Sequence, residues 1–168
     1  MTTGADSPGH QARSAARLAA VQALYQIAIG GQSGTEVIAE FVAHRLGAET
    51  DGVQYADADA DHFAAVVHGV IDNAAAVERL ITAAAAQGWG ANRLEITLRA
   101  VLSAAAYELL ERVDVPARVV IAEYVDLTRS FFDEAGKAAF VNDVLDTWAR
   151  ELRSAEMAAA APPRAAAK

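Results

Sequence analysis

Cationic and aromatic side chains near both ends of the chain are of the types that bind single-stranded nucleic acid. Arg13 and Arg17 are four residues apart, so both point from one face of a helix, and Tyr25 lies eight residues beyond Arg17. Lys137 and Phe140 are three residues apart near the other end. An aromatic ring offers a stacking plane to a base and cations offer partners to phosphates, the combination that RNA recognition requires. The alternative to RNA binding is that the arginines are solvated surface residues and that the aromatic rings pack in the core, which is compatible with the same spacing.

An acidic run in the middle of the chain resembles a metal site but lacks the required pattern. Asp57, Asp59 and Asp61 imitate the start of a calcium loop, in which the sixth position is Gly and the twelfth is a bidentate Glu. Counted from Asp57, those positions are His62 and His68. We therefore expect an acidic helix start, which interacts favourably with the helix dipole, and no calcium site.

The remaining candidates for chemistry also fail. The four histidines do not occur four apart with a carboxylate on one helix face, so no zinc site is predicted. The glycines at 30, 31 and 34 are not followed by Lys-Ser/Thr, so they do not form a phosphate loop. The chain has no cysteine, which excludes disulfides and thiolate chemistry, and no Ser-His-acid arrangement is legible. We predict no metal and no cofactor.

Length and composition indicate one helical domain. The chain has 168 residues, of which 54% are hydrophobic, enough to bury a sizeable core. Alanine is abundant and no β-branched runs are bounded by hairpin turns. No stretch of eighteen apolar residues suggests a membrane span, and residues 1–11 have no apolar core of a secretory signal. A cytoplasmic protein without membrane contact is expected.

The charge distribution argues against RNA binding by phosphate neutralisation alone. The formal net charge is −8. Residues 31–112 carry five arginines against twelve acidic residues, whereas residues 1–30 carry two arginines against Asp6. A basic footprint is the usual mark of a nucleic-acid-binding domain. Composition alone would favour a protein-interaction domain.

Apolar spacing and helix punctuation predict an all-α fold, a compact bundle of six to seven helices. Residues 1–11 are predicted to be a disordered arm, 12–153 the helical domain and 154–168 a flexible tail. The predicted helices cover residues 12–29, 35–46 (with Thr35 as N-cap), 57–87 with a break near 72–73 left open, 92–112, and two helices from Pro116 onward separated by residues 133–136.

Three segments, in order, resemble the NusB family of bacterial transcription antitermination factors. Residues 17–25 read RLAAVQALY and residues 107–110 read YELL. Residues 114–146 contain DVP, IAE and FVN followed by VLD. Together they cover about residues 12–153. The resemblance implies two packed three-helix subdomains and a non-catalytic adaptor. It would hold boxA RNA against NusE, a small-subunit ribosomal protein, and would contact other Nus factors and RNA polymerase indirectly.

The resemblance also implies a set of RNA-binding residues. In the family, the arginine-bearing N-terminal segment and the start of the K-F-V-N helix form the RNA surface. The residues that we assign to it here are Arg13, Arg17, Tyr25, Lys137, Phe140 and Asn142. Phe140 is expected at the rim of the last helix, beside Lys137 and Asp143, where it could stack on a base. Because Asp143 stands where the family has Gly, we expect RNA affinity to depend on NusE.

Two alternatives stay open on the sequence. One is a NusB-fold module that acts through protein contacts and binds RNA weakly or not at all. The other is a fragment of a ribosomal RNA cytosine methyltransferase, in which a related helical domain precedes the catalytic domain. An Ala-rich apolar surface also leaves a homodimer open.

Overall fold

The computed structural model describes residues 7–46, 49–50, 53–54, 58–86 and 95–160. Within them the chain is all-α, as predicted, apart from two short strands. The helices are α1 (Pro8–Gly30), α2 (Gly34–His44), α3 (Ala60–Asp72), α4 (Ala74–Ala86), α5 (Ile96–Glu111), α6 (Ala117–Phe131), α7 (Ala135–Leu152) and α8 (Ser154–Ala160). Strand β1 (Glu49–Thr50) pairs antiparallel with β2 (Val53–Gln54).

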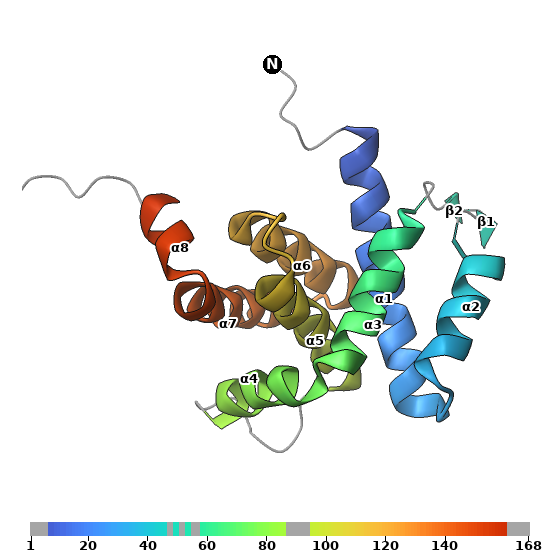
Figure 1. Cartoon of the computed structure of the whole chain (residues 1–168), viewed down its shortest axis with the longest axis horizontal. Helices are drawn as coiled ribbons and strands as arrows, with labels where there is room; N and C mark the ends of the chain where they lie inside the picture. Colours follow the sequence, from blue (N-terminus) through green and yellow to red (C-terminus); the bar gives the residue numbers. More distant parts are fainter. Residues whose placement is uncertain (1–6, 47–48, 51–52, 55–57, 87–94, 161–168) are drawn as a thin grey trace, which may run out of the picture. The chain divides into compact units, whose positions relative to one another are not determined.

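The chain divides into two compact units, residues 1–107 and residues 108–168, with the boundary inside α5. The first unit contains α1–α4 and most of α5, and the second contains the end of α5 with α6–α8. In the first unit α1, α2 and α3 pack on one another, and in the second α6 packs on α7 and α7 on α8 (Figure 1). The first unit thus has more helices than the three that the family resemblance implies for a subdomain.

Local capping explains where α1 and α2 begin and end. The Ser7 side chain accepts a hydrogen bond from the backbone N–H of His10 and precedes Pro8, whose fixed φ suits the first turn. Gly31 ends α1 with a φ of 67°, a left-handed conformation that glycine adopts without steric cost. Ser33 and Glu36 form a reciprocal capping box at the start of α2. The predicted cap at Thr35 is therefore wrong by two residues.

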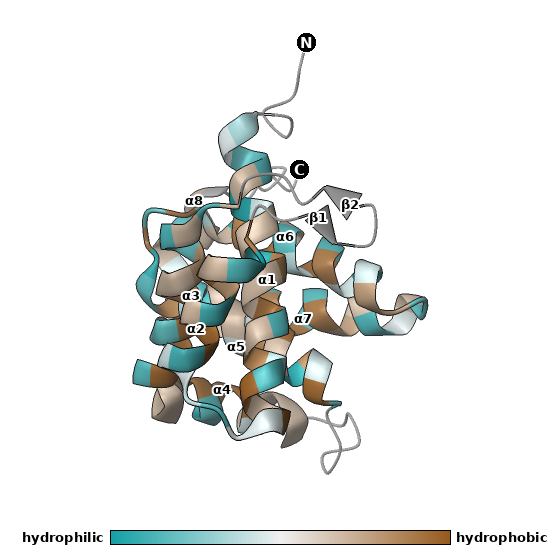
Figure 2. Cartoon of the chain, turned by 90° about the vertical axis from the view of Figure 1, so that its right-hand side faces the viewer, coloured by the Kyte–Doolittle hydropathy of each residue, from teal (hydrophilic) through white to brown (hydrophobic). Residues whose placement is uncertain are grey.

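Helix α3 forms the centre of the first unit. Phe63 stacks on Phe41 of α2 with ring centroids 5.4 Å apart, and both rings are buried. Gly69 lies against the Tyr107 ring, which a Cβ at position 69 would overlap, so only glycine permits this approach. Helix α2 carries both hydrophilic and hydrophobic residues (Figure 2), and its buried side chains, Val37, Ile38 and Phe41, recur at helical spacing on one face.

A buried arginine organises the second unit. Arg153, which follows α7, donates hydrogen bonds to the backbone carbonyls of Leu109 (3.0 Å), Glu108 and Arg112 (2.7 Å each) and Val115 (2.5 Å). The last carbonyls of a helix lack a full set of partners within the helix. Arg153 therefore caps the end of α5 and the connection to α6 with a single side chain.

Helix α8 is attached to the same region. The Glu156 carboxylate accepts a hydrogen bond from the Ala117 N–H at 2.7 Å, at the start of α6, where Pro116 provides no side-chain cap. Glu156 also lies 3.4 Å from the Arg153 guanidinium, and Met157 is buried. Residues 154–160 are therefore an ordered helix and not the flexible tail that the sequence predicts.

The remaining differences from the prediction are at helix ends. The helix predicted from residue 12 begins at Pro8, inside the predicted arm. The break left open near residues 72–73 occurs at Asn73, which separates α3 from α4. With α8, this gives eight helices in the described residues against six or seven predicted. The predicted cap Asn92 lies outside the described residues. No helix among those described is both long and apolar enough to cross a bilayer.

Candidate functional site

The predicted residues of α1 differ in their exposure. The Arg13 side chain is 42% exposed and lies 3.9 Å from the carboxylate of Asp59, the N-cap of α3. Tyr25 is 39% exposed, so its ring is available to a base. Arg17 is only 1% exposed. Arg17, which we assigned to the RNA surface, is therefore an interior residue and offers RNA no exposed guanidinium.

The predicted residues of α7 also separate into exposed and buried side chains. Asn142 is exposed. The Lys137 ammonium lies 4.2 Å from the centroid of the Phe132 ring and 3.5 Å from the Glu134 carboxylate. Phe140 is 2% exposed. The prediction of Phe140 at the rim is wrong, since the helix start turns its ring into the core together with Val141.

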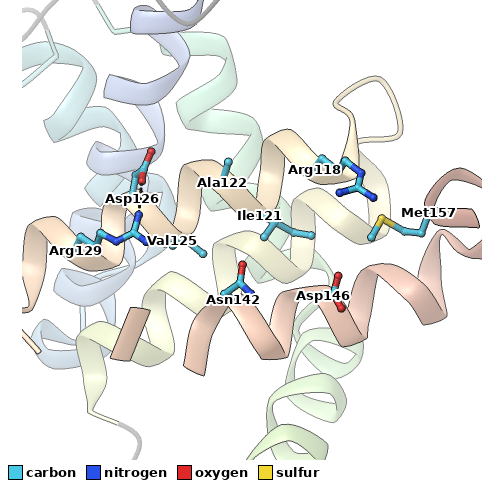
Figure 3. Close-up of a pocket in the computed structure, with 9 residues that line it drawn as sticks. All are labelled: Arg118, Ile121, Ala122, Val125, Asp126, Arg129, Asn142, Asp146 and Met157. Carbon is cyan, nitrogen blue, oxygen red and sulfur yellow. Dashed lines mark hydrogen bonds and ion pairs between the residues drawn. The ribbon is translucent and has the colours of Figure 1, made fainter. Parts of the chain in front are cut away.

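A groove of about 260 Å³ runs between α6 and α7 in the second unit. One wall is a stripe of α6 side chains, namely Arg118, Ile121, Ala122, Val125, Asp126 and Arg129. Asn142 and Asp146 of α7 form the other wall, and Met157 of α8 closes one end. Figure 3 shows Arg118 and Arg129 at opposite ends, with Asn142 and Asp146 projecting toward Ile121. Of the six predicted site residues, only Asn142 lines this groove.

The groove has an apolar floor and a balanced set of charges. Ile121 and Val125 are apolar, whereas the lining arginines number two and the lining aspartates number two. Asp126 accepts a hydrogen bond from Arg129 at 2.9 Å, and Asp146 accepts one from Arg150 at 2.8 Å. Each lining aspartate is thus paired with an arginine, which offsets its charge. The groove therefore suits an uncharged, flat, polar ligand better than a lone anion.

Metal chemistry finds no support in the part of the chain that the structure describes. No three His, Asp or Glu side chains gather there in a way that could hold an ion. Asp59, from the run that resembles a calcium loop, accepts a hydrogen bond from the His62 N–H and caps α3. Asp57 lies outside the described residues.

The chain matches the NusB family model over residues 14–150. The chain belongs to the NusB family. The match covers most of the chain, including all of α6 and residues 135–150 of α7.

The relatives of the chain within the NusB family are similar over nearly their whole length. Transcription antitermination protein NusB of Sinorhizobium fredii is 48% identical over 153 residues, which are 90% of this chain and 95% of that protein. Transcription antitermination protein NusB of Nitrobacter hamburgensis is 49% identical over 146 residues, 87% of this chain and 91% of that protein. The solved structure of T. maritima NusB has a TM-score of 0.68 at 25% identity and covers 87% of this chain and 96% of that one.

These similarities confirm the predicted NusB family, the all-α NusB-like fold and a transcription antitermination function. Members of the NusB family are non-enzymatic, which is the ground for assigning this chain no catalytic activity. The methyltransferase alternative gains no support from them, because the relatives above are antitermination proteins.

Sequence reasoning missed the arginines of the groove, although a signal was present. Arg118, Ile121, Val125 and Arg129 follow one another at intervals of three and four residues, which places them on one face of α6. The apolar residues whose spacing predicts α6 from the sequence, among them Val120 and Tyr124, belong to its buried face. Arg118 and Arg129 are exposed on this face, whereas Val125 between them is buried.

Proposed function

We propose that this NusB-family chain is a cytoplasmic adaptor that binds boxA-type RNA together with NusE and supports transcription of ribosomal RNA. The observation that carries the proposal is the similarity to antitermination proteins over 95% of the length of one relative. Contacts with other Nus factors and with RNA polymerase would then be indirect, through the assembled complex. An adaptor needs surfaces for two partners and no catalytic centre.

We assign the RNA contacts to the exposed members of the predicted set. Arg13 offers a partly exposed cation, Tyr25 an exposed aromatic ring and Asn142 an exposed amide. Lys137 keeps 20% of its side chain exposed and supplies a second cation. These are the groups that single-stranded RNA recognition uses: cations for phosphates, a ring for stacking and an amide for base edges. Arg17 and Phe140 are buried and are not assigned direct RNA contacts.

The acidic composition favours a binding mode that depends on NusE. With a net charge of −8, the chain alone attracts phosphates poorly. A cationic partner placed beside the RNA would supply the counter-charge that this chain lacks. The alternative is a module that acts through protein contacts and does not bind RNA. The negative net charge and the burial of Arg17 and Phe140 support this alternative.

A reconstituted transcription assay tests the proposed function. Elongation through a terminator is measured on templates with an intact or a scrambled boxA, with the polymerase, the Nus factors and NusE present. We expect the chain to increase read-through only when boxA is intact. Read-through that is unchanged by the chain, or equal on both templates, would contradict the proposal. Light scattering of the purified chain in the same buffer distinguishes a monomer from a homodimer.

A further inference from the structure

The groove between α6 and α7 contains an amide that the fold leaves available. Asn142 is exposed, and its side chain makes no hydrogen bond to any other residue that the structure describes. Its neighbour in the groove, Asp146, is held by Arg150 at 2.8 Å. An asparagine amide presents a donor and an acceptor in one plane, the arrangement that pairs with the edge of a base.

The opposite wall supplies complementary groups. Ile121 and Val125 form an apolar surface between Arg118 and Arg129. The Arg129 guanidinium is anchored by Asp126 at 2.9 Å and is 65% exposed, so its plane remains accessible. A base can stack on a guanidinium plane or on apolar side chains, and the amino groups of bases donate to carboxylates.

The charge and the volume of the groove limit the kind of ligand that it could bind. The two arginines and two aspartates of the lining balance, so the groove offers a phosphate chain no net attraction. Its volume of about 260 Å³ lies below the range of about 300–1,000 Å³ that is typical of small-molecule pockets. A single nucleobase is uncharged, flat and rich in donors and acceptors, and it fits both limits.

We propose that the groove is a base-specific subsite, in which one unstacked base of the bound RNA lies between Asn142 and the Arg129 side of α6. This inference rests on the proposed RNA-binding function and deepens it, because it names where sequence would be read. Arg13, Tyr25 and Lys137 would hold the RNA, and the groove would distinguish one base from another.

An abasic scan of the RNA combined with two variants tests the proposal. RNA affinity is measured for the full chain with NusE, using boxA RNA oligonucleotides that each lack one base and keep every phosphate. Asn142→Ala removes the amide, and Ala122→Leu fills the groove at an exposed helical position without a change of charge. Thr147→Ala is the control, since Thr147 is exposed on α7 outside the groove.

We expect both groove variants to weaken binding of intact boxA RNA by roughly tenfold, the order of one well-formed base contact. With one particular abasic RNA the loss should disappear, because that RNA no longer has the base that the groove holds. Thr147→Ala should leave all affinities unchanged. Thermal unfolding of each variant should match that of the original chain.

Other outcomes would overturn the inference. Equal losses with every abasic RNA would mean that the groove contacts the backbone. Unchanged RNA affinity with weakened NusE binding would make the groove a protein site. In both cases the original chain would still bind boxA RNA, so only the subsite would be rejected. If the original chain with NusE binds boxA and scrambled RNA equally, the proposed function itself fails.

Discussion

The Arg153 guanidinium donates a hydrogen bond to the carbonyl oxygen of Leu109, 44 residues earlier in the chain, at 3.0 Å. The same side chain reaches the carbonyls of Glu108, Arg112 and Val115. A buried charge is tolerated only where several polar partners replace its water. The planar fork of a guanidinium can serve four carbonyls at once, which the three donors of a lysine ammonium cannot do.

We predict that Arg153→Lys destabilises the chain by about 2–4 kcal/mol, because it leaves buried carbonyls without donors. Urea unfolding of the full chain, followed by circular dichroism, measures the change. Arg150→Lys is the matched control: Arg150 is 66% exposed on the preceding turn and is paired with Asp146. It should change stability by less than about 0.5 kcal/mol. Equal effects of the two variants would refute the role of Arg153 as a cap.

A second prediction concerns Phe140, which is buried on α7. Truncation of a buried phenylalanine removes apolar contacts and leaves a cavity, so Phe140→Ala should cost about 3–5 kcal/mol of stability. Phe140→Leu keeps most of the volume and should cost clearly less. Differential scanning calorimetry compares the two variants. A midpoint unchanged by Phe140→Ala, together with weakened RNA binding, would restore Phe140 to the RNA surface.

The features of the fold that could be predicted from the sequence are those that depend on residues only a few positions apart. The spacing of Val120, Tyr124 and Leu127 predicts α6, and Gly31 predicts the end of α1, because both signals act within a few residues. The Ser33-x-x-Glu36 capping box was equally local and was overlooked.

The burial of charged and aromatic side chains was not visible in the same way. Arg17 and Arg153 are interior residues although arginine is mostly exposed in proteins. Arg153 is buried because its side chain donates to carbonyls 38 to 45 residues earlier in the chain. Contacts over such separations do not follow from the helical spacing of apolar residues. Phe140 precedes Val141 on α7, and period alone could not tell whether its ring lies in the core or at the rim. The exposed amide of Asn142 was assigned only through the family resemblance.

Arg13 and Arg17 provide a third prediction, in which neighbours on α1 behave differently. Arg13→Ala breaks a partly exposed ion pair with Asp59 and should cost less than about 1 kcal/mol. Its RNA affinity should fall and the slope of log K against log salt should flatten by about one unit or less. Arg17→Ala should instead destabilise the fold by about 2–4 kcal/mol, since it removes a buried, partnered charge. An unchanged salt slope for Arg13→Ala would place the RNA surface elsewhere.

A fourth prediction concerns the buried hydrogen bond from the Tyr124 hydroxyl to the Glu108 carboxylate, which joins α6 to the end of α5. Tyr124→Phe removes the donor and should cost about 1–3 kcal/mol, because the carboxylate stays buried. Glu108→Gln in the Tyr124→Phe background should cost less than Glu108→Gln alone. Urea unfolding of the four proteins gives the coupling energy, and strict additivity would exclude an energetic role for this bond.

Cooperation between this NusB-family chain, RNA and NusE is central to the proposed function. The most direct measurement is a fluorescence anisotropy titration of boxA RNA with the chain alone, with NusE alone and with both, at one fixed salt concentration. We expect the pair to bind boxA RNA at least about tenfold more tightly than either protein alone, which corresponds to about 1.4 kcal/mol. Scrambled RNA should not show this gain. Equal affinity with and without NusE, or an equal gain for scrambled RNA, would contradict the account.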